Sequence, residues 1–481
     1  MPSYIPSKLT KIVATLGPAY DSPEQIEKLI LAGVDVFRFN FKHGEIEWHK
    51  DRIRKVKEAA KKLGVPVGLM MDVQGPSFRI ILDELQKQIH IGDTFEFGSP
   101  VFTTTHPHII PALCKGQKLL IDDGTIIFEV IEDPQPNAQT VKIQSQSEAL
   151  LKTRKSLNTP GADFPVDLLT ERDLIGIDMA VEEEMGLFAF SFARTAQDII
   201  DVKKRLKEKG CRAKVCAKLE TAQSMDNLDA IVEETDIAMV ARGDLGVETP
   251  IQEVPIHQKR MIETCLHHGK AVITATQMMA SMEKNKYPTR AEVSDVANAV
   301  LDHTDAIMTS GETASGMYPL ETIAMMTRIA EVTQMKGKPY MRPVMKLHLE
   351  DDASRVAHVA HKLYMDFIDS SHDIAAFVVF TQTGRTAELI SHFRSGAPIY
   401  AFTSDPILME SLCLYYAVTP MLVKSEDSGS VEQDQVESAV HKLKIAGYVK
   451  PGQSVIVLHG DQWGATGGTS TVRLVEVTEV K

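Results

Sequence analysis

Three consecutive residues near the middle of the chain combine charges that suit chemistry on a small anionic substrate. Lys218-Leu219-Glu220 ends a short apolar run, and side chains at positions i and i+2 of a strand point to the same side. If 214–220 is a strand, the Lys218 amine and the Glu220 carboxylate face one cavity while Leu219 packs behind them. An amine beside a metal-binding carboxylate suits reactions in which negative charge develops on an oxygen-rich substrate.

Other apolar runs also end in polar residues. In 36–42 three phenylalanines alternate with Arg38, Asn40 and Lys42, so a strand would bury the rings on one side and present the polar groups on the other. Further runs end at or near Asp72, Ser191, Gly243, Asp244, Thr276 and Ser310. Agreement among so many run ends favours a shared site over isolated salt bridges or strand-end hydrogen bonds.

Strands that alternate with helices would bring these ends together. Strand patterns are predicted near 11–17, 34–41, 66–73, 187–193, 214–220, 237–243, 271–277 and 306–311. Amphipathic segments such as 23–32, 48–62, 197–209 and 253–268 separate them. Eight β-then-α units predict the α/β class and a closed parallel (β/α)8 TIM barrel, whose active site lies where the strands end.

The barrel pattern is interrupted once and then stops. Short alternating segments with turns at Gly92-Asp93 and Asp122-Asp123-Gly124 predict a small antiparallel β domain inserted at 76–160. The barrel is therefore expected to occupy 1–75 and 161–343. A new series of strands near 374–380, 398–402, 418–423 and 454–458 predicts a separate C-terminal α/β domain at 344–481.

The polar strand ends suggest individual roles. Glu220 and Asp244 could hold a Mg²⁺ ion that keeps waters and substrate oxygens as its other ligands. Arg38 presents a fork that suits a phosphoryl group, and Lys218 can stabilise an enolate oxygen or a phosphoryl group in transfer. The hydroxyls of Thr276 and Ser310 could pass protons, although either could simply hydrogen-bond a strand end.

The last domain contains a candidate anion site. A strand pattern is followed by hydroxyls, a glycine and an arginine at the start of a helical pattern, which is typical of a phosphate cradle; an ordinary N-cap is the alternative. The residues are Thr381, Thr383, Gly384, Arg385 and Thr386. A glycine-rich segment, 459–469, could close over the same pocket or form only a turn.

Composition limits the class of protein. The 481 residues are 43% apolar and have a net charge of −13, which predicts folded domains and argues against nucleic-acid binding. The chain start lacks a secretory pattern, and no apolar stretch approaches the roughly 20 residues of a membrane span. Five cysteines without paired spacing fit a reducing cytoplasm.

Taken together, the motifs closely resemble those of the pyruvate kinases over essentially the whole chain. The matching blocks are 14–19, 38–44, 215–220, 239–248, 275–278, 288–299 and 310–314. The resemblance implies glycolytic transfer of the phosphoryl group of phosphoenolpyruvate to ADP, which gives pyruvate and ATP. It also implies a barrel with an inserted lid, a C-terminal effector domain and a homotetramer.

Residue roles follow from the resemblance. Glu220 and Asp244 would bind Mg²⁺, with Mn²⁺ as an alternative ion, while Lys218 and Arg38 act on the phosphoryl group. The backbone of Gly243 and Asp244 and the Thr276 hydroxyl would receive the substrate carboxylate, near Ser191, and a proton path would involve Thr276 and Ser310. The nucleotide would lie near Pro18, Asn40, His43, Trp48, Arg79, Arg154 and Lys155.

Departures from the family pattern concern the monovalent cation. Family members that need K⁺ have serine and threonine where this chain has Lys42 and Val73, so two oxygen ligands are missing. The chain also has Gln74 and Ser77 where those relatives have lysine and glutamate. We expect the Lys42 ammonium, paired with Asp72 and beside Asn40, to replace K⁺ and make the enzyme independent of it.

Two other functions fit part of the pattern. One is a metal-dependent aldolase or lyase acting on a pyruvate enolate, but a lyase needs no nucleotide clamp such as Arg79, Arg154 and Lys155. The other is a non-catalytic metabolite-sensing relative. In the C-terminal loop, Gln382 stands where many relatives have lysine, so one charge is missing, which would either shift preference from bisphosphorylated to monophosphorylated sugars or abolish effector binding. Sugar phosphates and AMP are the candidate effectors.

Overall fold

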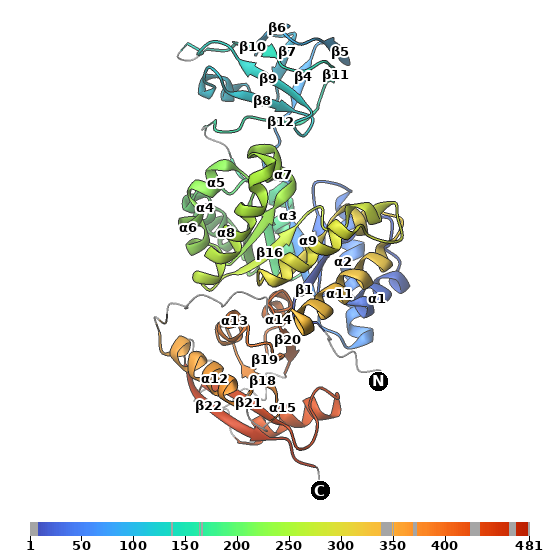
Figure 1. The fold of residues 1–481 in the computed structure, drawn as a ribbon, viewed down its shortest axis with the longest axis vertical. Helices are drawn as coiled ribbons and strands as arrows, with labels where there is room; N and C mark the ends of the chain where they lie inside the picture. The colour runs from blue at the N-terminus through green and yellow to red at the C-terminus, as the bar shows by residue number, and fades with distance from the viewer. Residues whose placement is uncertain are drawn as a thin grey trace.

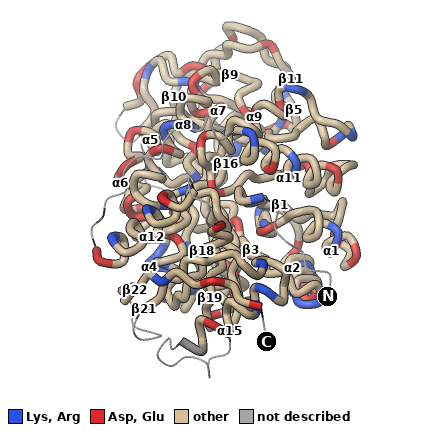
Figure 2. The backbone as a smooth tube through the Cα atoms, turned by 60° about the horizontal axis from the view of Figure 1, so that its bottom comes forward, with Lys and Arg blue, Asp and Glu red and all other residues tan. Residues whose placement is uncertain are grey.

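The computed structural model describes residues 8–135, 138–162, 164, 167–337, 349, 351–368, 373–423, 433–460 and 468–479. Figure 1 shows three parts stacked along the long axis: a small β domain, a barrel surrounded by helices, and a C-terminal α/β domain. In Figure 2, basic and acidic residues are interspersed along the whole tube, so the net charge of −13 is not concentrated in one tract.

Within the described residues, eight parallel strands close into the predicted barrel in the order β1-β17-β16-β15-β14-β13-β3-β2. They are β1 (Lys11–Thr15), β2 (Val36–Asn40), β3 (Gly68–Asp72), β13 (Leu187–Phe190), β14 (Lys214–Leu219), β15 (Ile237–Ala241), β16 (Ala271–Ala275) and β17 (Ala306–Thr309). The fold class and the barrel predicted from the sequence are confirmed.

Helices cover the outside of the barrel. They are α1 (Pro23–Ala32), α2 (Ile46–Leu63), α3 (Glu171–Glu182), α4 (Ala196–Glu208), α5 (Ala222–Asp226), α6 (Leu228–Glu234), α7 (Arg242–Glu248), α8 (Val254–His267), α9 (Arg290–Leu301), α10 (Gly311–Ala314) and α11 (Pro319–Lys336). Local sequence sets several of their starts. Ser22 and Gln25, for example, form a reciprocal capping box before α1, and Gly33 ends that helix with φ +119°.

Alternation along each strand separates two layers of core. Phe37 and Phe39 of β2 pack in the cluster beneath the helices, whereas Val36 joins a second cluster with Met70 and Met239 inside the barrel. Arg38 shares the inward face with Val36 because residues two apart point the same way. The strands therefore bury their apolar residues and direct polar ones to the mouth.

The segment between β3 and β13 forms separate antiparallel sheets rather than barrel strands. Its strands are β4 (Ile80–Leu82), β5 (Gln86–Ile89), β6 (Thr94–Phe97), β7 (Phe102–Thr104), β8 (Lys118–Ile121), β9 (Ile126–Val130), β10 (Val141–Ser145), β11 (Ala149–Lys152) and β12 (Leu157–Asn158). They enclose their own apolar core, which contains Phe97, Phe102 and Phe128.

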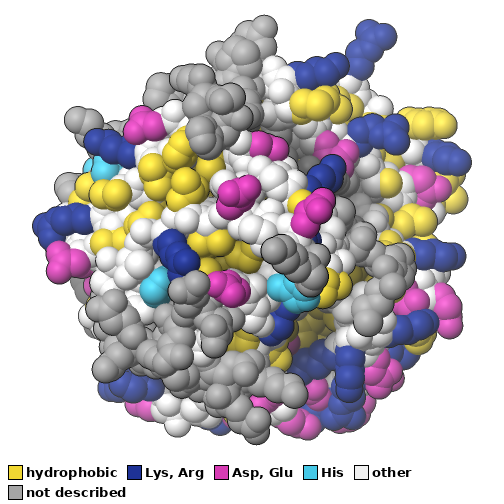
Figure 3. Space-filling view, turned by 90° about the horizontal axis from the view of Figure 1, so that it is seen from below, with side chains coloured by type: hydrophobic (Ala, Val, Ile, Leu, Met, Phe, Trp, Pro, Cys, Tyr) yellow, Lys and Arg dark blue, Asp and Glu magenta, His cyan; other side chains and the backbone are white. Residues whose placement is uncertain are grey.

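The C-terminal part is a five-stranded sheet of order β20-β19-β18-β21-β22 with helices against it. Its elements are α12 (Asp352–Ile368), β18 (Ile374–Phe380), α13 (Arg385–His392), β19 (Ile399–Thr403), α14 (Pro406–Leu412), β20 (Val418–Leu422), α15 (Gln433–Ile445), β21 (Ser454–Gly460) and β22 (Thr469–Glu476). The antiparallel edge strand β22 was not predicted. Seen from below in Figure 3, hydrophobic side chains form separate patches among charged ones.

None of the helices in the described ranges is both long and apolar enough to cross a membrane.

The junction between the barrel and the C-terminal domain contains a buried histidine that should make stability depend on pH. His392, the last residue of α13, is 1% exposed, and burial lowers its pKa to about 3. The unfolded chain takes up a proton below its ordinary pKa of 6.5, whereas the folded chain stays neutral, so stability falls as pH decreases from 6.5 towards 3.

We therefore expect wild type to lose about 2 kcal/mol more unfolding free energy than His392→Phe between pH 7 and pH 5. Urea unfolding of both proteins at the two pH values measures this difference. An equal loss in the two proteins would contradict the assignment.

Candidate active site

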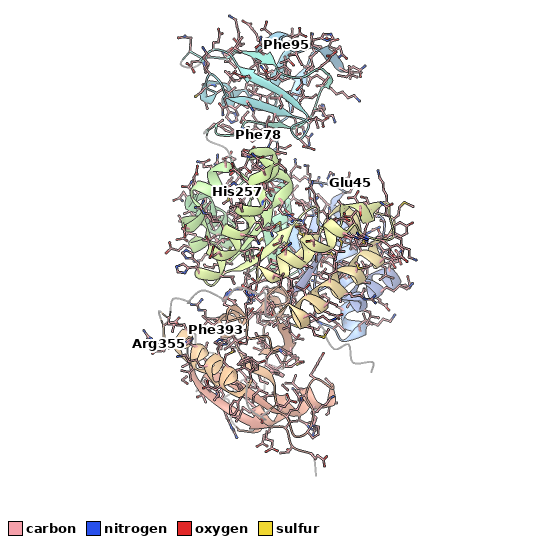
Figure 4. All side chains as sticks on the ribbon, in the orientation of Figure 1. Glu45, Phe78, Phe95, His257, Arg355 and Phe393 are labelled. Carbon is pink, nitrogen blue, oxygen red and sulfur yellow. The ribbon has the colours of Figure 1, made fainter. Side chains whose placement is uncertain are left out.

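The barrel mouth and the inserted domain enclose a cavity of about 200 Å³. Its lining includes nine polar residues predicted from the sequence to belong to the site: Arg38, Asn40, Lys42, Asp72, Arg79, Ser191, Lys218, Glu220 and Asp244. In Figure 4, Phe78, which also lines this cavity, lies at the junction between the two parts. Eight of these were expected to converge as strand ends and do line one cavity, whereas Arg79 comes from the segment just before β4 and was expected as a nucleotide residue.

Lys218 and Glu220 form the buried centre of the cavity. The Lys218 Nζ donates a hydrogen bond to the Ser191 Oγ at 2.7 Å and lies 3.3 Å from the Glu220 Oε2. The other carboxylate oxygen of Glu220 accepts from the backbone N–H of Phe192 at 2.9 Å, and Phe192 adopts a φ of +62°. Leu219 packs on the opposite side in the apolar cluster under the helices.

The electrostatics of this centre keep an ammonium beside a carboxyl group that is difficult to ionise. Burial raises the pKa of Glu220 to about 7, although Lys218 acts to lower it. Burial lowers the pKa of Lys218, but the carboxylates of Glu220, Asp72 and Asp244 outweigh burial and raise it above its ordinary value. Lys218 is therefore a permanent positive charge in the cavity.

Arg38 is held rigidly at the edge of this centre. Its Nε donates to the Asp72 Oδ2 at 2.5 Å, and its Nη1 donates to the Thr15 Oγ1 at 2.8 Å. The Arg38 side chain is only 9% exposed and that of Asp72 2%. A planar donor fixed in this way suits the oxygens of a phosphoryl group.

Asp244 is on a helix rather than directly after the strand predicted near 237–243. Strand β15 ends at Ala241, and α7 begins at Arg242. Arg242 fixes this start because its Nη1 pairs with both carboxylate oxygens of Asp295 at 2.7 and 2.8 Å. The exposed Asp244 carboxylate is thus placed at the cavity by the first turn of α7.

Two of the groups expected to receive the substrate carboxylate are hydrogen-bonded to each other. The Gly243 N–H donates to the Thr276 Oγ1 at 2.9 Å, and Thr276 has a left-handed φ of +69°. A substrate carboxylate would have to replace this bond. Ser310 does not line the cavity; its backbone N–H donates to Glu312 at the start of α10.

The predicted pairing of Lys42 with Asp72 is wrong. Strand β2 ends at Asn40, and the Lys42 backbone N–H donates to the Asn40 Oδ1 at 3.3 Å, so Lys42 lies beyond the strand rather than on its face. Asp72 is already paired with Arg38. Within the described residues the exposed Lys42 has no ion pair, although it lines the same cavity.

The expected nucleotide residues come together only in part. Asn40 and Arg79 line the cavity, whereas Pro18, His43, Trp48, Arg154 and Lys155 are outside its lining. The Arg79 Nη1 donates to the Arg154 backbone oxygen at 2.8 Å, and Lys155 pairs with Asp122 at 2.7 Å. The guanidinium carbon of Arg52 lies over the Trp48 ring, 4.7 Å from the ring centroid.

The predicted anion loop of the C-terminal domain has the form of a helix start. The Gly384 N–H donates to the Thr381 Oγ1 at 2.9 Å, and the Arg385 N–H to the Thr383 Oγ1 at 3.4 Å. Thr386 and Thr469 join their hydroxyls at 2.5 Å. Residues 461–467 of the predicted covering segment lie outside the described residues.

Several lining residues were missed by the sequence analysis. Phe192 follows β13 and orients Glu220 through its backbone, and Asp123, Ser156, Leu157 and Asn158 reach the cavity from the inserted domain. The turn at Asp122-Asp123-Gly124 was recognisable, but no local pattern shows which face of the lid meets the barrel.

Comparison with known proteins identifies the family. The family model of the pyruvate kinase barrel domain matches residues 7–323, and that of the pyruvate kinase alpha/beta domain matches 363–475. This chain belongs to the pyruvate kinase family.

Known relatives are similar in sequence over nearly the whole length of this chain. A pyruvate kinase of Bacillus licheniformis is 36% identical over 97% of this chain and 80% of its own. Pyruvate kinase II of Salmonella typhimurium is 37% identical over 97% of this chain and 98% of its own. The protein is thus an enzyme, a phosphotransferase, and the lyase and non-catalytic hypotheses are set aside.

Pyruvate kinase activity implies phosphoenolpyruvate, ADP, pyruvate and ATP as substrates and products, together with a divalent metal ion. The cavity fits such an ion. The Glu220 Oε2 is buried and accepts no hydrogen bond from the described residues, and Asp244 lines the same space. Nowhere in the described ranges do three acidic, histidine or cysteine residues gather as a metal cluster.

Proposed function

We propose that Lys218, Arg38, Glu220 and Asp244 form the phosphoryl-transfer centre of this pyruvate kinase. The observation that supports this is their convergence on one cavity, with the Lys218 Nζ 3.3 Å from the Glu220 Oε2. Glu220 and Asp244 would hold Mg²⁺ or Mn²⁺, which when bound neutralises charge on the phosphoryl and enolate oxygens. Lys218 supplies a second, permanent positive charge at the same place.

The other residues position the substrates. Arg38, fixed by Asp72 and Thr15, would bind the phosphoryl oxygens in a bidentate manner. The carboxylate of phosphoenolpyruvate would displace Thr276 from the Gly243 N–H, which frees the Thr276 hydroxyl for the protonation of the enolate. Ser310 would lie on the path by which solvent returns a proton to the Thr276 hydroxyl. Ser191 orients Lys218.

An assay of ATP formation from phosphoenolpyruvate and ADP tests the proposal directly. The wild-type protein should form ATP with Mg²⁺ or Mn²⁺ and lose this activity when a chelator removes the divalent ion. Pyruvate formation without ATP would contradict it.

We also propose that the enzyme does not need K⁺. The two hydroxyl ligands found in K⁺-dependent relatives are replaced by Lys42 and Val73, and Asp72 is neutralised by Arg38. Lys42 supports the proposal by its place in the cavity lining, where its ammonium adds the positive charge that a bound K⁺ would add.

Steady-state rates with a bulky organic cation as the only monovalent ion should therefore change less than about twofold when K⁺ is added. The Lys42→Met variant should lose about tenfold in kcat/KM, because about one charge-assisted contact is removed. Lys50→Met, on the nearby helix α2 and paired with Glu182, is the control and should stay near wild type. A tenfold or larger stimulation of the wild type by K⁺ would refute the proposal.

We also propose where the nucleotide and an effector bind. ADP would lie between the barrel mouth and the inserted domain, near Pro18, Asn40, His43, Trp48, Arg79, Arg154 and Lys155. A sugar phosphate or AMP would bind the loop at 381–386 and regulate a cytoplasmic homotetramer whose inserted domain spans 76–160. Titration of these effectors against the substrate saturation curve, and light scattering for the assembly, test the two points.

A further inference from the structure

One hydrogen bond joins the inserted domain to the helix that presents Asp244. The Asn158 Nδ2 donates to the Glu248 Oε1 at 2.9 Å. Asn158 belongs to β12, which pairs with β8 inside the inserted domain, whereas Glu248 is the last residue of α7. Figure 1 shows α7 at the top of the barrel, beneath β12.

Asn158 stands between two cavities. It lines the catalytic cavity and also a neighbouring one of about 230 Å³, to which Glu248, Arg194 and Gln223 contribute. Phe78, labelled at this junction in Figure 4, lines both. The hydrogen bond therefore lies where the inserted domain rests on the barrel.

Both ends of α7 are anchored, and the catalytic groups lie between the anchors. At its start, Arg242 pairs with Asp295 and donates from Nε to the Ala275 oxygen at 3.2 Å. At its end, Glu248 is bound by the inserted domain. A helix of seven residues is only about 10 Å long and moves as one body, so the last residue influences the direction of Asp244 in the first turn.

The anchor at Glu248 can be released. Within the described part of the chain, Glu248 forms no ion pair, and its partner is a neutral amide. Burial and the charge of Asp244 raise the pKa of Glu248 to about 7, so the carboxyl group is easily protonated near neutral pH. One amide hydrogen bond can orient α7 when the inserted domain is close and yet break when substrates enter or products leave.

We propose that the Asn158–Glu248 hydrogen bond couples the position of the inserted domain to that of α7 and so aligns Asp244 for phosphoryl transfer. Asn158 and Glu248 are thus positioning residues. The inference rests on the proposed function because it takes Asp244 as a ligand of the divalent ion.

A double-mutant cycle on the full-length enzyme tests the coupling. Asn158→Ala and Glu248→Ala should each lower kcat about tenfold while the KM for phosphoenolpyruvate stays within about threefold. The double variant should be no slower than either single variant, because one bond is lost in all three. Additive losses, or an unchanged kcat in the single variants, would overturn the proposal.

Exchange of donor and acceptor distinguishes coupling from general damage to the fold. Glu248→Gln keeps an acceptor oxygen and should stay within about threefold of the wild type. Asn158→Asp places two carboxyl groups together and should be slow, and the double variant Asn158→Asp with Glu248→Gln should recover because the amide then donates in the opposite direction. Failure to recover would count against the proposal.

Gln223→Ala is the matched control. Gln223 lines the second cavity, and its side chain forms no hydrogen bond within the described ranges, so this variant should match the wild type. Formation of ATP by the wild type in the same assay tests the proposed function separately. If the wild type forms no ATP, the assignment of the site is wrong. If the wild type is active and the losses in the variants are additive, only the coupling is refuted.

Discussion

Replacement of Lys218 by methionine should lower kcat by about a thousandfold or more, the largest functional loss expected from any single substitution in this enzyme. Methionine keeps the length of the side chain but removes the charge. The Lys218 Nζ lies 3.3 Å from the Glu220 Oε2 in the cavity, and the two side chains are only 13% and 1% exposed, so a fixed charge at this position acts more strongly on a developing anion than it would in open water.

The rate of ATP formation at saturating substrate measures this loss. Ser191→Ala is the control in the same contact, because it removes the neutral partner of the lysine and leaves the charge; we expect a loss of about tenfold. Circular dichroism and thermal melting establish that both variants fold. A Lys218→Met enzyme within tenfold of the wild type would contradict the assigned role.

The centre of the site could be predicted because it depends on two simple rules, the alternation of side chains along a strand and the common mouth of a parallel barrel. Arg38, Lys218 and Glu220 follow from alternation along single strands, since residues two apart share a face. The convergence of different strands follows from the parallel barrel, because all its strands end at one mouth. Such inferences need no knowledge of how distant loops fold.

The predictions that failed concern the residues just beyond the strands. Arg242 to Glu248 form a helix although Gly243 and Gly246 are poor helix formers, because contacts of Arg242 with Asp295 and Ala275 stabilise its first turn. Lys42 leaves the strand face because Asn40 caps its backbone N–H. Tertiary contacts decide both outcomes, and local patterns do not contain them.

Contacts between the inserted domain and the barrel were also beyond prediction. Asn158 and Glu248 are 90 residues apart in the sequence, and neither stands in a pattern that distinguishes it from other polar surface residues. Only the packing of β12 above α7 brings them together. The lid was recognisable as a separate unit, but its docking face was not.

A second large effect is expected at the junction between the barrel and the C-terminal domain, where a fully buried ion pair joins them. The Arg394 Nη2 donates to the Asp305 Oδ2 at 2.6 Å, and the two side chains are 1% and 0% exposed. Asp305 also accepts from the backbone N–H groups of Val272 and Tyr416. Asp305 precedes β17 of the barrel, and Arg394 follows α13, so the pair fixes one domain against the other.

Asp305→Ala should therefore lower the free energy of unfolding by about 3–5 kcal/mol, because it leaves the Arg394 guanidinium buried without its counter-charge. Urea unfolding measures the loss. Arg212→Ala, which removes an ion pair with Asp405 across the same junction but from a side chain that is 60% exposed, should cost less than about 1 kcal/mol. The double variant Asp305→Leu with Arg394→Met removes both charges, so it should lose less than Asp305→Ala alone; a larger loss would show that packing, rather than the unpaired charge, dominates at this junction.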